Sequence, residues 1–202
     1  ISPCVKVNIR TSIRYALASA LVNQIGQHQF GQELAKGIRM IAKAMQGRTA
    51  VVTGSGRNIG RAIALSLARE GANLVINGHS DRAAVDSVVA EVQSLGASAI
   101  PSMTDVSDDT AVATMIAAAA ERFGSVDIVV SNVGIRRKQP FLDISPADWD
   151  EVMRTNLSAA FYLARHAIPS MQARKWGRIV LISGFDGFWG QVTERAHNVT
   201  AK

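Results

Sequence analysis

The sequence predicts an α/β fold, a doubly wound parallel sheet with helices on both faces, and three observations lead to it. From residue 49 onward, short apolar runs alternate with longer stretches that have helical spacing. Glycine follows several of the longer stretches, where a helix would end. Each longer stretch can also carry the chain between parallel strands, which takes about a dozen residues or more. Such crossovers place helices on both faces of a sheet.

Five strands are expected, because five runs are apolar or β-branched and are bounded by turn residues. They lie at 50–53, 73–77, 98–103, 127–131 and 178–183. Pro101 stands inside the third run. A proline cannot donate a ladder hydrogen bond, so the third strand is expected at an edge of the sheet.

Helices are expected between the strands, at 58–69, 82–95 and 108–123. The first repeats apolar residues at helical spacing, and a glycine follows each of the other two. A longer fourth helix is expected from Ser145, with the serine as N-cap and Pro146 as the first helical residue. It runs through Trp149, Met153, Leu157 and Phe161.

Ligands of open parallel sheets bind outside the carboxyl ends of the strands. The functional residues are therefore expected in the loops that follow the strands. These loops lie at 54–60, 77–81, 104–107, 132–138 and 184–194.

Residues 1–46 are expected to form a basic extension, separate from a domain at 47–202. The extension holds six bases and one acid, whereas the domain holds 16 bases and 15 acids, so most of the net charge of +6 belongs to the extension. Apolar residues within it recur on one face of a helix. A basic amphipathic segment suits a transit peptide or a membrane-surface helix. An upstream extension outside the functional domain is favoured, because the chain starts with Ile1 and Met45 directly precedes the first strand.

The composition bears on several classes of function. No run of about 18 or more uncharged apolar residues occurs, so no membrane span is expected. The aromatic content of 5% and the near-neutral domain argue against nucleic acid as a partner. The single cysteine, Cys4, cannot form an internal disulfide, which favours a reducing compartment, the cytoplasm. No metal site is predicted.

The loop after the first strand reads TGSGRNIG, at 53–60. Glycines in a strand-to-helix turn let the backbone approach a pyrophosphate, which then sits on the free N–H groups of the helix N-terminus. The position of this loop favours a dinucleotide site over a tight turn that merely needs small residues. The loop residues expected at the cofactor are Gly54, Ser55, Arg57, Asn58, Ile59 and Gly60.

At this point the chain resembles the short-chain dehydrogenase/reductase family, from about residue 45 to residue 202. The family motif TGxxxGxG is matched at Thr53, Gly54 and Gly60. Asn58 stands where a glycine is usual, and asparagine tolerates a left-handed conformation better than other non-glycine residues. The resemblance implies a Rossmann-type fold.

Three further motifs of that family recur in order. SNVG, at 131–134, resembles the family's NNAG and keeps Asn132 and Gly134. Asp105 and Val106 stand where the family has an adenine contact, and Asn156 matches its helix-borne asparagine. The resemblance therefore implies cofactor contacts from Asp105, Val106, Asn132 and Gly134.

NADP is the expected cofactor, with NAD as the alternative. An acid at the end of the second strand would bind the ribose 2′-hydroxyl of NAD, whereas a nearby base accommodates the 2′-phosphate of NADP. This chain has NGHS at 77–80 and no acid before Asp81. Arg57 occupies a loop position that many NADP-using relatives fill with arginine. Arg57 and His79 are expected at the 2′-phosphate, unless both are solvated loop residues.

The expected catalytic residues depart from the family pattern. The family protonates the alkoxide with a tyrosine, lowers the pKa of that tyrosine with a lysine four residues later, and polarises the carbonyl with a serine. The two tyrosines of this chain, Tyr15 and Tyr162, lie elsewhere. With Lys202 as the family lysine, the tyrosine position is Asn198 and the serine position is Gly184.

Three residues are nevertheless predicted at the catalytic site by this resemblance. Lys202 is expected to bind the nicotinamide ribose, and Asn156 to hold a water near it. His197 takes the tyrosine position if one residue is inserted, and its ordinary pKa suits proton donation near neutral pH. The alternative is a solvent-facing histidine at a helix start.

Two functions stay open. The first is an NADP-dependent oxidoreductase of the 3-oxoacyl carrier-protein reductase type, which interconverts a small ketone and a secondary alcohol. The second is a non-catalytic module that holds a dinucleotide or a sister subunit. The family domain continues beyond the fifth strand, so the domain is interpreted as incomplete at the C-terminus and the chain as a fragment. The resemblance implies a homo-oligomer when the domain is complete.

Overall fold

In a computed structural model of the chain, the described residues are 43–185, 187 and 194–202. The chain divides into two compact units, Ile1–Lys43 and Ala44–Lys202, and the fold below is that of the second. The amphipathic segment predicted in the extension lies outside the described residues, as does Tyr15.

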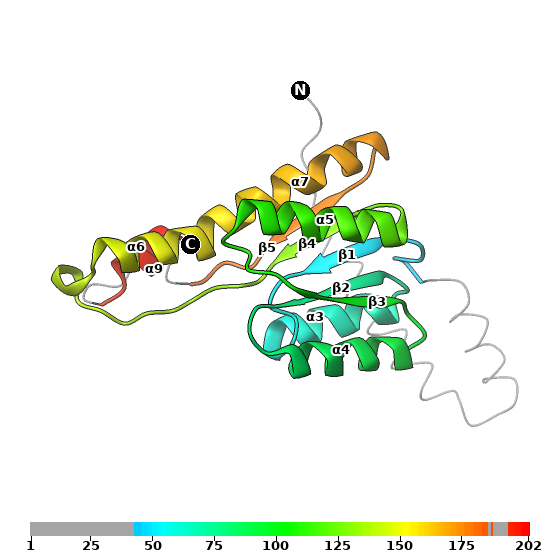
Figure 1. The fold of residues 1–202 in the computed structure, drawn as a ribbon, viewed down its shortest axis with the longest axis horizontal. Helices are drawn as coiled ribbons and strands as arrows, with labels where there is room; N and C mark the ends of the chain where they lie inside the picture. The colour runs from blue at the N-terminus through cyan, green and yellow to red at the C-terminus, as the bar shows by residue number, and fades with distance from the viewer. Residues whose placement is uncertain (1–42, 186, 188–193) are drawn as a thin grey trace, which may run out of the picture. The chain divides into compact units, whose positions relative to one another are not determined.

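The described strands form one parallel sheet in the order β3-β2-β1-β4-β5 (Figure 1). The strands are β1 (Thr49–Val52), β2 (Asn73–Gly78), β3 (Ala99–Met103), β4 (Ile128–Ser131) and β5 (Arg178–Leu181). The predicted α/β parallel sheet is confirmed. The strand with Pro101 lies at an edge of the described sheet, as predicted.

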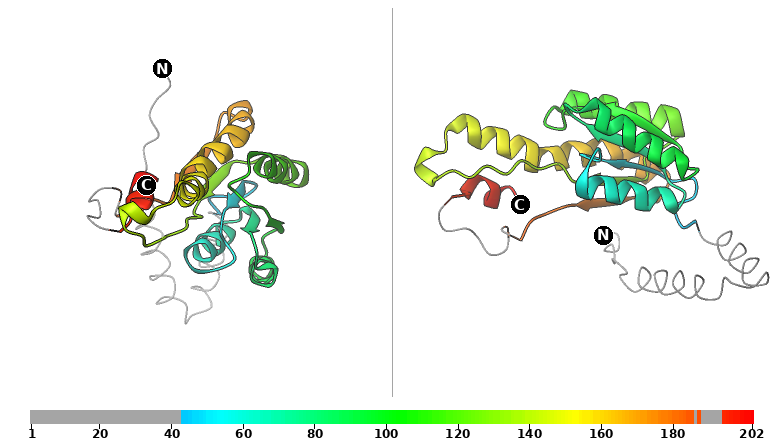
Figure 2. Two further views of the ribbon diagram at one scale, coloured as in Figure 1. Left: turned by 60° about the vertical axis from the view of Figure 1, so that its left-hand side comes forward. Right: turned by 90° about the horizontal axis from the view of Figure 1, so that it is seen from below.

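Helices cover both faces of the sheet, as Figure 1 and Figure 2 show. One face carries α3 (Asn58–Arg69) and α4 (Arg82–Ser94). The other carries α5 (Asp109–Phe123) and α7 (Ala159–Ala173). The sheet is therefore doubly wound.

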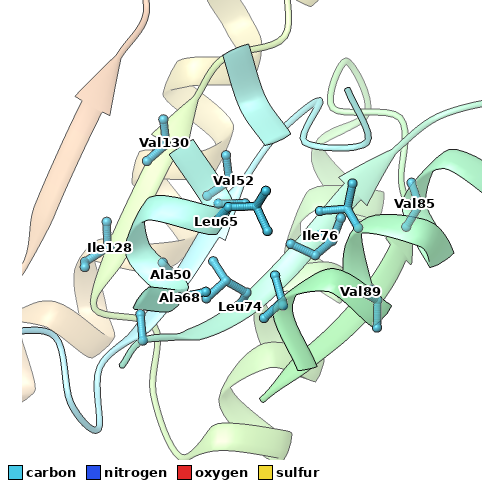
Figure 3. Close-up of a cluster of buried hydrophobic side chains, with 14 residues drawn as sticks. Ala50, Val52, Leu65, Ala68, Leu74, Ile76, Val85, Val89, Ile128 and Val130 are labelled. Carbon is cyan, nitrogen blue, oxygen red and sulfur yellow. The ribbon is translucent and has the colours of Figure 1, made fainter. Parts of the chain in front are cut away.

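Alternate residues of each central strand enter two separate cores, because successive side chains of a strand point to opposite faces. Ala50 and Val52 pack with Leu65 of α3 and Val85 of α4 in the first core (Figure 3). Val51 enters the second core, against α5 and α7. The central strands are buried on both sides, which explains why they read as unbroken apolar runs.

The helix predicted from Ser145 is continuous but changes type. It begins as α6 (Pro146–Met153), where Ser145 Oγ accepts a hydrogen bond from the Asp148 N–H at 3.1 Å, as the predicted cap requires. A π-helical turn, η2 (Arg154–Ser158), then leads into α7. A π turn inserts an extra residue and shifts the face that follows. Leu157 and Phe161, on the predicted apolar line, are accordingly 53% and 60% exposed.

Two short elements complete the described structure. The 3-10 helix η1 (Phe141–Asp143) precedes α6, and α9 (Ala196–Thr200) packs beside α6 (Figure 2). Strand β5 forms the second edge of the described sheet, and all four of its residues are exposed. Three of those four are apolar, so this edge keeps apolar surface uncovered within the described residues.

A buried carboxylate fixes the amino ends of β1 and β4. The Asp127 side chain is 0% exposed and accepts hydrogen bonds from the Thr49 N–H at 3.0 Å and Ser125 Oγ at 2.9 Å. Arg48 Nη1 and Arg174 Nε each donate to Asp127 Oδ1 at 3.1 Å. Burial opposes ionisation of Asp127, but these hydrogen bonds and the positive charge of Arg174 hold its pKa below the ordinary value.

We predict that Asp127→Ala lowers the free energy of unfolding by about 3 kcal/mol, because it leaves a buried N–H and a hydroxyl without their acceptor. Urea denaturation at neutral pH measures the loss. The folded-state pKa is lowered, so the stabilisation is present above the ordinary carboxyl pKa and disappears as the pH falls through the folded-state value. Asp86→Ala, which removes an exposed ion pair with Arg82, is the control and costs less than about 0.5 kcal/mol. Equal losses in the two variants would contradict the prediction.

Candidate functional site

A cavity of about 370 Å³ opens at the carboxyl ends of the strands. Its walls come from the end of β2, the start of α4 and the loops after β1, β2, β3 and β4, together with Glu151 of α6 and Thr155 of η2. Strand order reverses at β1, which lies between β2 and β4. Ligands of open parallel sheets bind at such a reversal. The cavity is therefore the candidate site.

The glycine loop brings the backbone of β1 against the start of α3. Gly54 adopts a left-handed conformation with φ of 61°, and a Cβ on Gly60 would lie 2.3 Å from the Gly54 carbonyl oxygen. Asn58 is also left-handed, with φ of 49°, at the position where the family has glycine. Arg57, at the N-cap of α3, makes no capping hydrogen bond with its side chain, which leaves N–H groups of the first turn for an anion.

The residues predicted in this loop have different roles. Gly54 and Arg57 line the cavity, whereas Asn58, Ile59 and Gly60 do not form its walls. Gly60 is buried and permits the close approach of the loop, and Ile59 is exposed. The predicted contacts of this loop thus divide into those at the cavity and those that shape the turn.

Ser55 holds the loop from inside. Its hydroxyl donates to the Val52 carbonyl at 2.7 Å and accepts from the Asn77 N–H at 2.9 Å. Ser55 was predicted among the loop residues at the cofactor. Its side chain is 0% exposed, so a cofactor cannot reach the hydroxyl. Asn77 Oδ1 in turn accepts from the Gly54 N–H at 3.2 Å. The sequence reasoning missed this role of Asn77, although a polar residue that ends an apolar strand was a usable signal.

Thr53 and Asn132 join the carboxyl ends of β1 and β4. The N–H groups of Asn132 and Val133 donate to Thr53 Oγ1 at 2.9 and 3.2 Å. Asn132 Nδ2 donates to the Thr53 carbonyl at 3.0 Å. The family asparagine therefore positions the glycine loop in this structure and does not line the cavity.

The end of the cavity beyond β2 and β3 is polar. Arg57, His79, Asp105 and Val106 line it. Gly78 also lines the cavity, and it packs closely against α4, since a Cβ there would lie 2.5 Å from Val85 Cγ2.

The Asp105 carboxyl is the acid of this polar end. Burial opposes its ionisation, but the Ser107 N–H, which donates at 2.9 Å, and the positive charges of His79 and Arg154 lower its pKa. A carboxylate and two bases thus face one end of the cavity.

Gly134 forms part of the wall at the other end, and Asn156 and Lys202 lie beside it without lining the cavity. Lys202 Nζ lies 3.3 Å, and Asn156 Oδ1 3.5 Å, from the point where a Cβ would stand on Gly134. Asn156 sits in the π turn and exchanges two hydrogen bonds with the main chain of Ile135, at 2.8 and 3.0 Å. Burial lowers the pKa of Lys202, and the nearby charge of Arg136 lowers it further. The structure thus brings together two of the three residues predicted at the catalytic site.

His197, the third of those residues, is buried in α9 with 0% exposure. Among the described residues, neither ring nitrogen has a hydrogen-bond partner, and both are buried. The alternative of a solvent-facing histidine is therefore wrong, since the side chain is fully buried. A proton donor has to reach its substrate, which this buried ring does not do in the described conformation.

The residues at the positions of the family tyrosine and serine do not present a hydroxyl to the site. Asn198 is buried, and its Nδ2 donates to the Arg137 carbonyl at 2.6 Å. Gly184 offers no side chain, and the adjacent Ser183 donates its hydroxyl to the Lys202 carbonyl at 2.9 Å. No side chain at either position presents a hydroxyl to the cavity.

Within the part of the chain that the structure describes, no cluster of three or more His, Cys, Asp or Glu side chains has the arrangement of a metal site. No described helix combines the length and apolar character needed to cross a bilayer.

Parallel sheet, glycine loop and a cavity at the strand reversal together define a dinucleotide-binding α/β domain. Residues 48–197 match the short chain dehydrogenase family, and the chain belongs to this family.

Several curated relatives resemble the chain over part of their length. Versicolorin reductase stcU of Emericella nidulans is 42% identical over 139 residues, which cover 69% of this chain and 52% of that protein. D-beta-hydroxybutyrate dehydrogenase of Rhizobium meliloti is 38% identical over 141 residues, 69% of this chain and 55% of that protein. The reductase FabG of Staphylococcus aureus, a 3-oxoacyl-[acyl-carrier-protein] reductase, is 35% identical over 143 residues, 71% and 58% of the two chains. The chain thus spans about half the length of these relatives.

A solved structure supports the same fold. The crystal structure of a protein described as a short-chain alcohol dehydrogenase from Sinorhizobium meliloti 1021 matches with a TM-score of 0.73 and 32% identity. The match covers 78% of this chain and 62% of that one.

We predict that Gly60→Ala lowers both the thermal midpoint and the cofactor affinity, because its Cβ would stand 2.3 Å from the Gly54 carbonyl oxygen. Gly56→Ala is the matched control in the same loop, since its Cβ would meet Ala84 and Val85 at an ordinary 3.5 Å. Thermal denaturation and fluorescence titration with NADPH compare the two variants. The prediction fails if Gly60→Ala is as stable as Gly56→Ala and binds NADPH as tightly.

Proposed function

We propose that the chain binds a nicotinamide dinucleotide, with a preference for NADP, and serves hydride transfer between it and a ketone or secondary alcohol. The observation that carries the proposal is the position of Lys202 and Asn156 beside Gly134, a wall residue of the cavity that Gly54 and Arg57 also line. Several relatives are named as reductases or dehydrogenases, which supports the same class of reaction.

The residues present fit such a cofactor. The Gly54 to Gly60 approach leaves no room for a Cβ and holds the loop tightly against the start of α3, whose uncapped N–H groups can receive the pyrophosphate. Arg57 and His79 line the cavity near the end of β2. A nicotinamide dinucleotide supplies or accepts the hydride when it is bound. The chain itself orients the bound molecules and handles the proton.

Reduction of a ketone also requires a proton for the new alkoxide. Asn198 stands where the family has its tyrosine, and a carboxamide is not an acid near neutral pH. We therefore assign the proton to the Lys202 ammonium, in place of the buried His197. Its lowered pKa makes this ammonium a better acid than an exposed lysine. The proton passes from Nζ to the alkoxide oxygen, and solvent then restores the ammonium.

The second candidate function is a dinucleotide-binding module without catalysis. It is favoured by the loss of a hydroxyl from both family positions, Asn198 and Gly184. The two functions differ in one measurement. A module binds NADPH but never consumes it in the presence of ketones, whereas a reductase consumes it.

A homo-oligomer is also proposed, through the exposed face of the helix that contains η2 and α7. Leu157, Phe161 and Ile168 are apolar and exposed on it, and a second copy of the chain would cover them. Phe161→Glu is expected to lower the molar mass measured by light scattering to that of one chain. An unchanged mass, or a single-chain mass in the parent protein, would rule this out.

For the cofactor, we predict that Arg57→Met weakens NADPH binding about tenfold, a loss of about 1.4 kcal/mol, and leaves NADH binding unchanged, because one charged partner of the 2′-phosphate is lost. Fluorescence titration with both nucleotides measures this. Arg61→Met is the control, because Arg61 pairs with Glu91 of α4 and does not line the cavity. Equal weakening of NADPH and NADH would refute the assignment of Arg57.

For the proton, we predict reductive turnover that falls as the pH rises through the lowered pKa of Lys202, because only the ammonium form can donate. Arg136→Met removes a repelling charge, so it should raise that pKa and move the alkaline limb to higher pH. Lys202→Arg is expected to lose most of kcat, since a guanidinium does not release its proton in this range. The rate of NADPH oxidation against pH provides the test. An alkaline limb that stays in place in Arg136→Met would exclude Lys202 as the acid.

A further inference from the structure

Three successive cations, Arg136, Arg137 and Lys138, stand in the loop that follows β4. Arg137 pairs with Asp148 at 2.6 Å and also with Glu151. Lys138 pairs with Glu194 at 3.0 Å. Arg136 is exposed, and among the described residues it has no carboxylate partner. One positive charge of this loop is therefore uncompensated.

The main chain at Arg136 is held beside the proposed reaction centre. It follows Ile135, whose N–H and carbonyl are both bonded to Asn156. Gly134, one residue earlier, is the residue next to which Lys202 Nζ lies. The neighbouring Arg137 is tied to α6 on one side and, through its carbonyl, to Asn198 on the other. The loop that carries Arg136 is thus fixed at several points.

Arg136 and Lys202 are like charges that both stand beside Gly134: Arg136 follows it by two residues, and Lys202 Nζ lies 3.3 Å from the point where a Cβ would stand on it. Burial lowers the pKa of the Lys202 ammonium, and the positive charge of Arg136 lowers it further. Lys202 is half-buried and donates to the Ile182 carbonyl, a neutral acceptor that does not cancel its charge. A bound anion would relieve this repulsion, whereas a neutral molecule would leave it.

We propose that Arg136 binds an anionic group, a carboxylate or a phosphate, on the carbonyl substrate, so that the site selects oxo acids or oxo phosphates over neutral ketones. The inference rests on the proposed function, because it concerns the substrate of the same site. A guanidinium suits this role, because its planar fork donates two parallel hydrogen bonds to a carboxylate or a phosphate.

The test compares acids with their neutral esters in the full chain saturated with NADP⁺, which cannot reduce a ketone. The probes are pyruvate and levulinate, whose carboxylates lie at different distances from the ketone, each against its methyl ester. Dihydroxyacetone phosphate provides the phosphate arm. Calorimetric titration gives the affinities. At least one acid or the phosphate is expected to bind about tenfold or more tightly than the neutral esters, and less tightly at high ionic strength.

Variants assign that selectivity to one residue. Arg136→Met, which keeps the length and removes the charge, is expected to bring acid and ester within about twofold, and Arg136→Lys to keep part of the difference. Lys138→Met is the matched control, because it removes a neighbouring cation that already has a partner, and it should keep the selectivity in full. The preferred probe identifies the anion as carboxylate or phosphate.

Three results would overturn the proposal: esters that bind as tightly as the acids, selectivity that persists in Arg136→Met, or no measurable binding of any anionic probe. Oxidation of NADPH is followed separately with the same probes. Anion selectivity that depends on Arg136, without any NADPH oxidation, would refute the reductase function and leave this binding site standing. If NADPH is oxidised with the neutral esters at the same kcat/KM as with the acids, the reductase function stands and the anion site at Arg136 is refuted.

Discussion

The junction between β1 and β4 is the constraint on which the candidate site depends. Thr53 Oγ1 receives the main-chain N–H groups of Asn132 and Val133, and Asn132 returns a hydrogen bond to the Thr53 carbonyl. The glycine loop leaves from one side of this junction, and the loop toward Gly134 leaves from the other. A small set of hydrogen bonds between two strand ends that are far apart in sequence thus positions both ends of the cavity.

The second requirement is to bring Lys202 to this junction from the far end of the described chain. The connection runs through main-chain groups of the loop after β4: Gln139 N–H donates to the Glu194 carbonyl at 2.8 Å, and the Arg137 carbonyl accepts from Asn198. Arg137 anchors the same loop on α6 through its two carboxylates. Lys202 therefore reaches Asn156 because α6, this loop and α9 are bound together.

Local features made most of the fold predictable from sequence. Pro101 marked an edge strand because proline lacks a donor, and Ser145 with Pro146 marked a helix start because the cap is a matter of adjacent residues. The π turn was not predictable, since the hydrogen bonds of Asn156 to Ile135 that accompany it come from tertiary contact. The burial of His197 and of the Ser55 hydroxyl could not be predicted for the same reason. Their residue types suggested contact with a ligand, but tertiary packing buries both side chains.

The π turn has a consequence for how this helix tolerates changes in length. The π turn absorbs one extra residue, so a deletion within 154–158 that converts it to α-helix would leave the residues after it on the faces they now occupy. The α-helical start of α7 has no such extra residue, and a deletion there would turn every later residue by about 100° about the helix axis. Leu163, which is fully buried against the sheet, would then leave the core. A single-codon deletion at 159–162 should therefore be far more damaging than one inside the π turn, although neither touches the glycine loop.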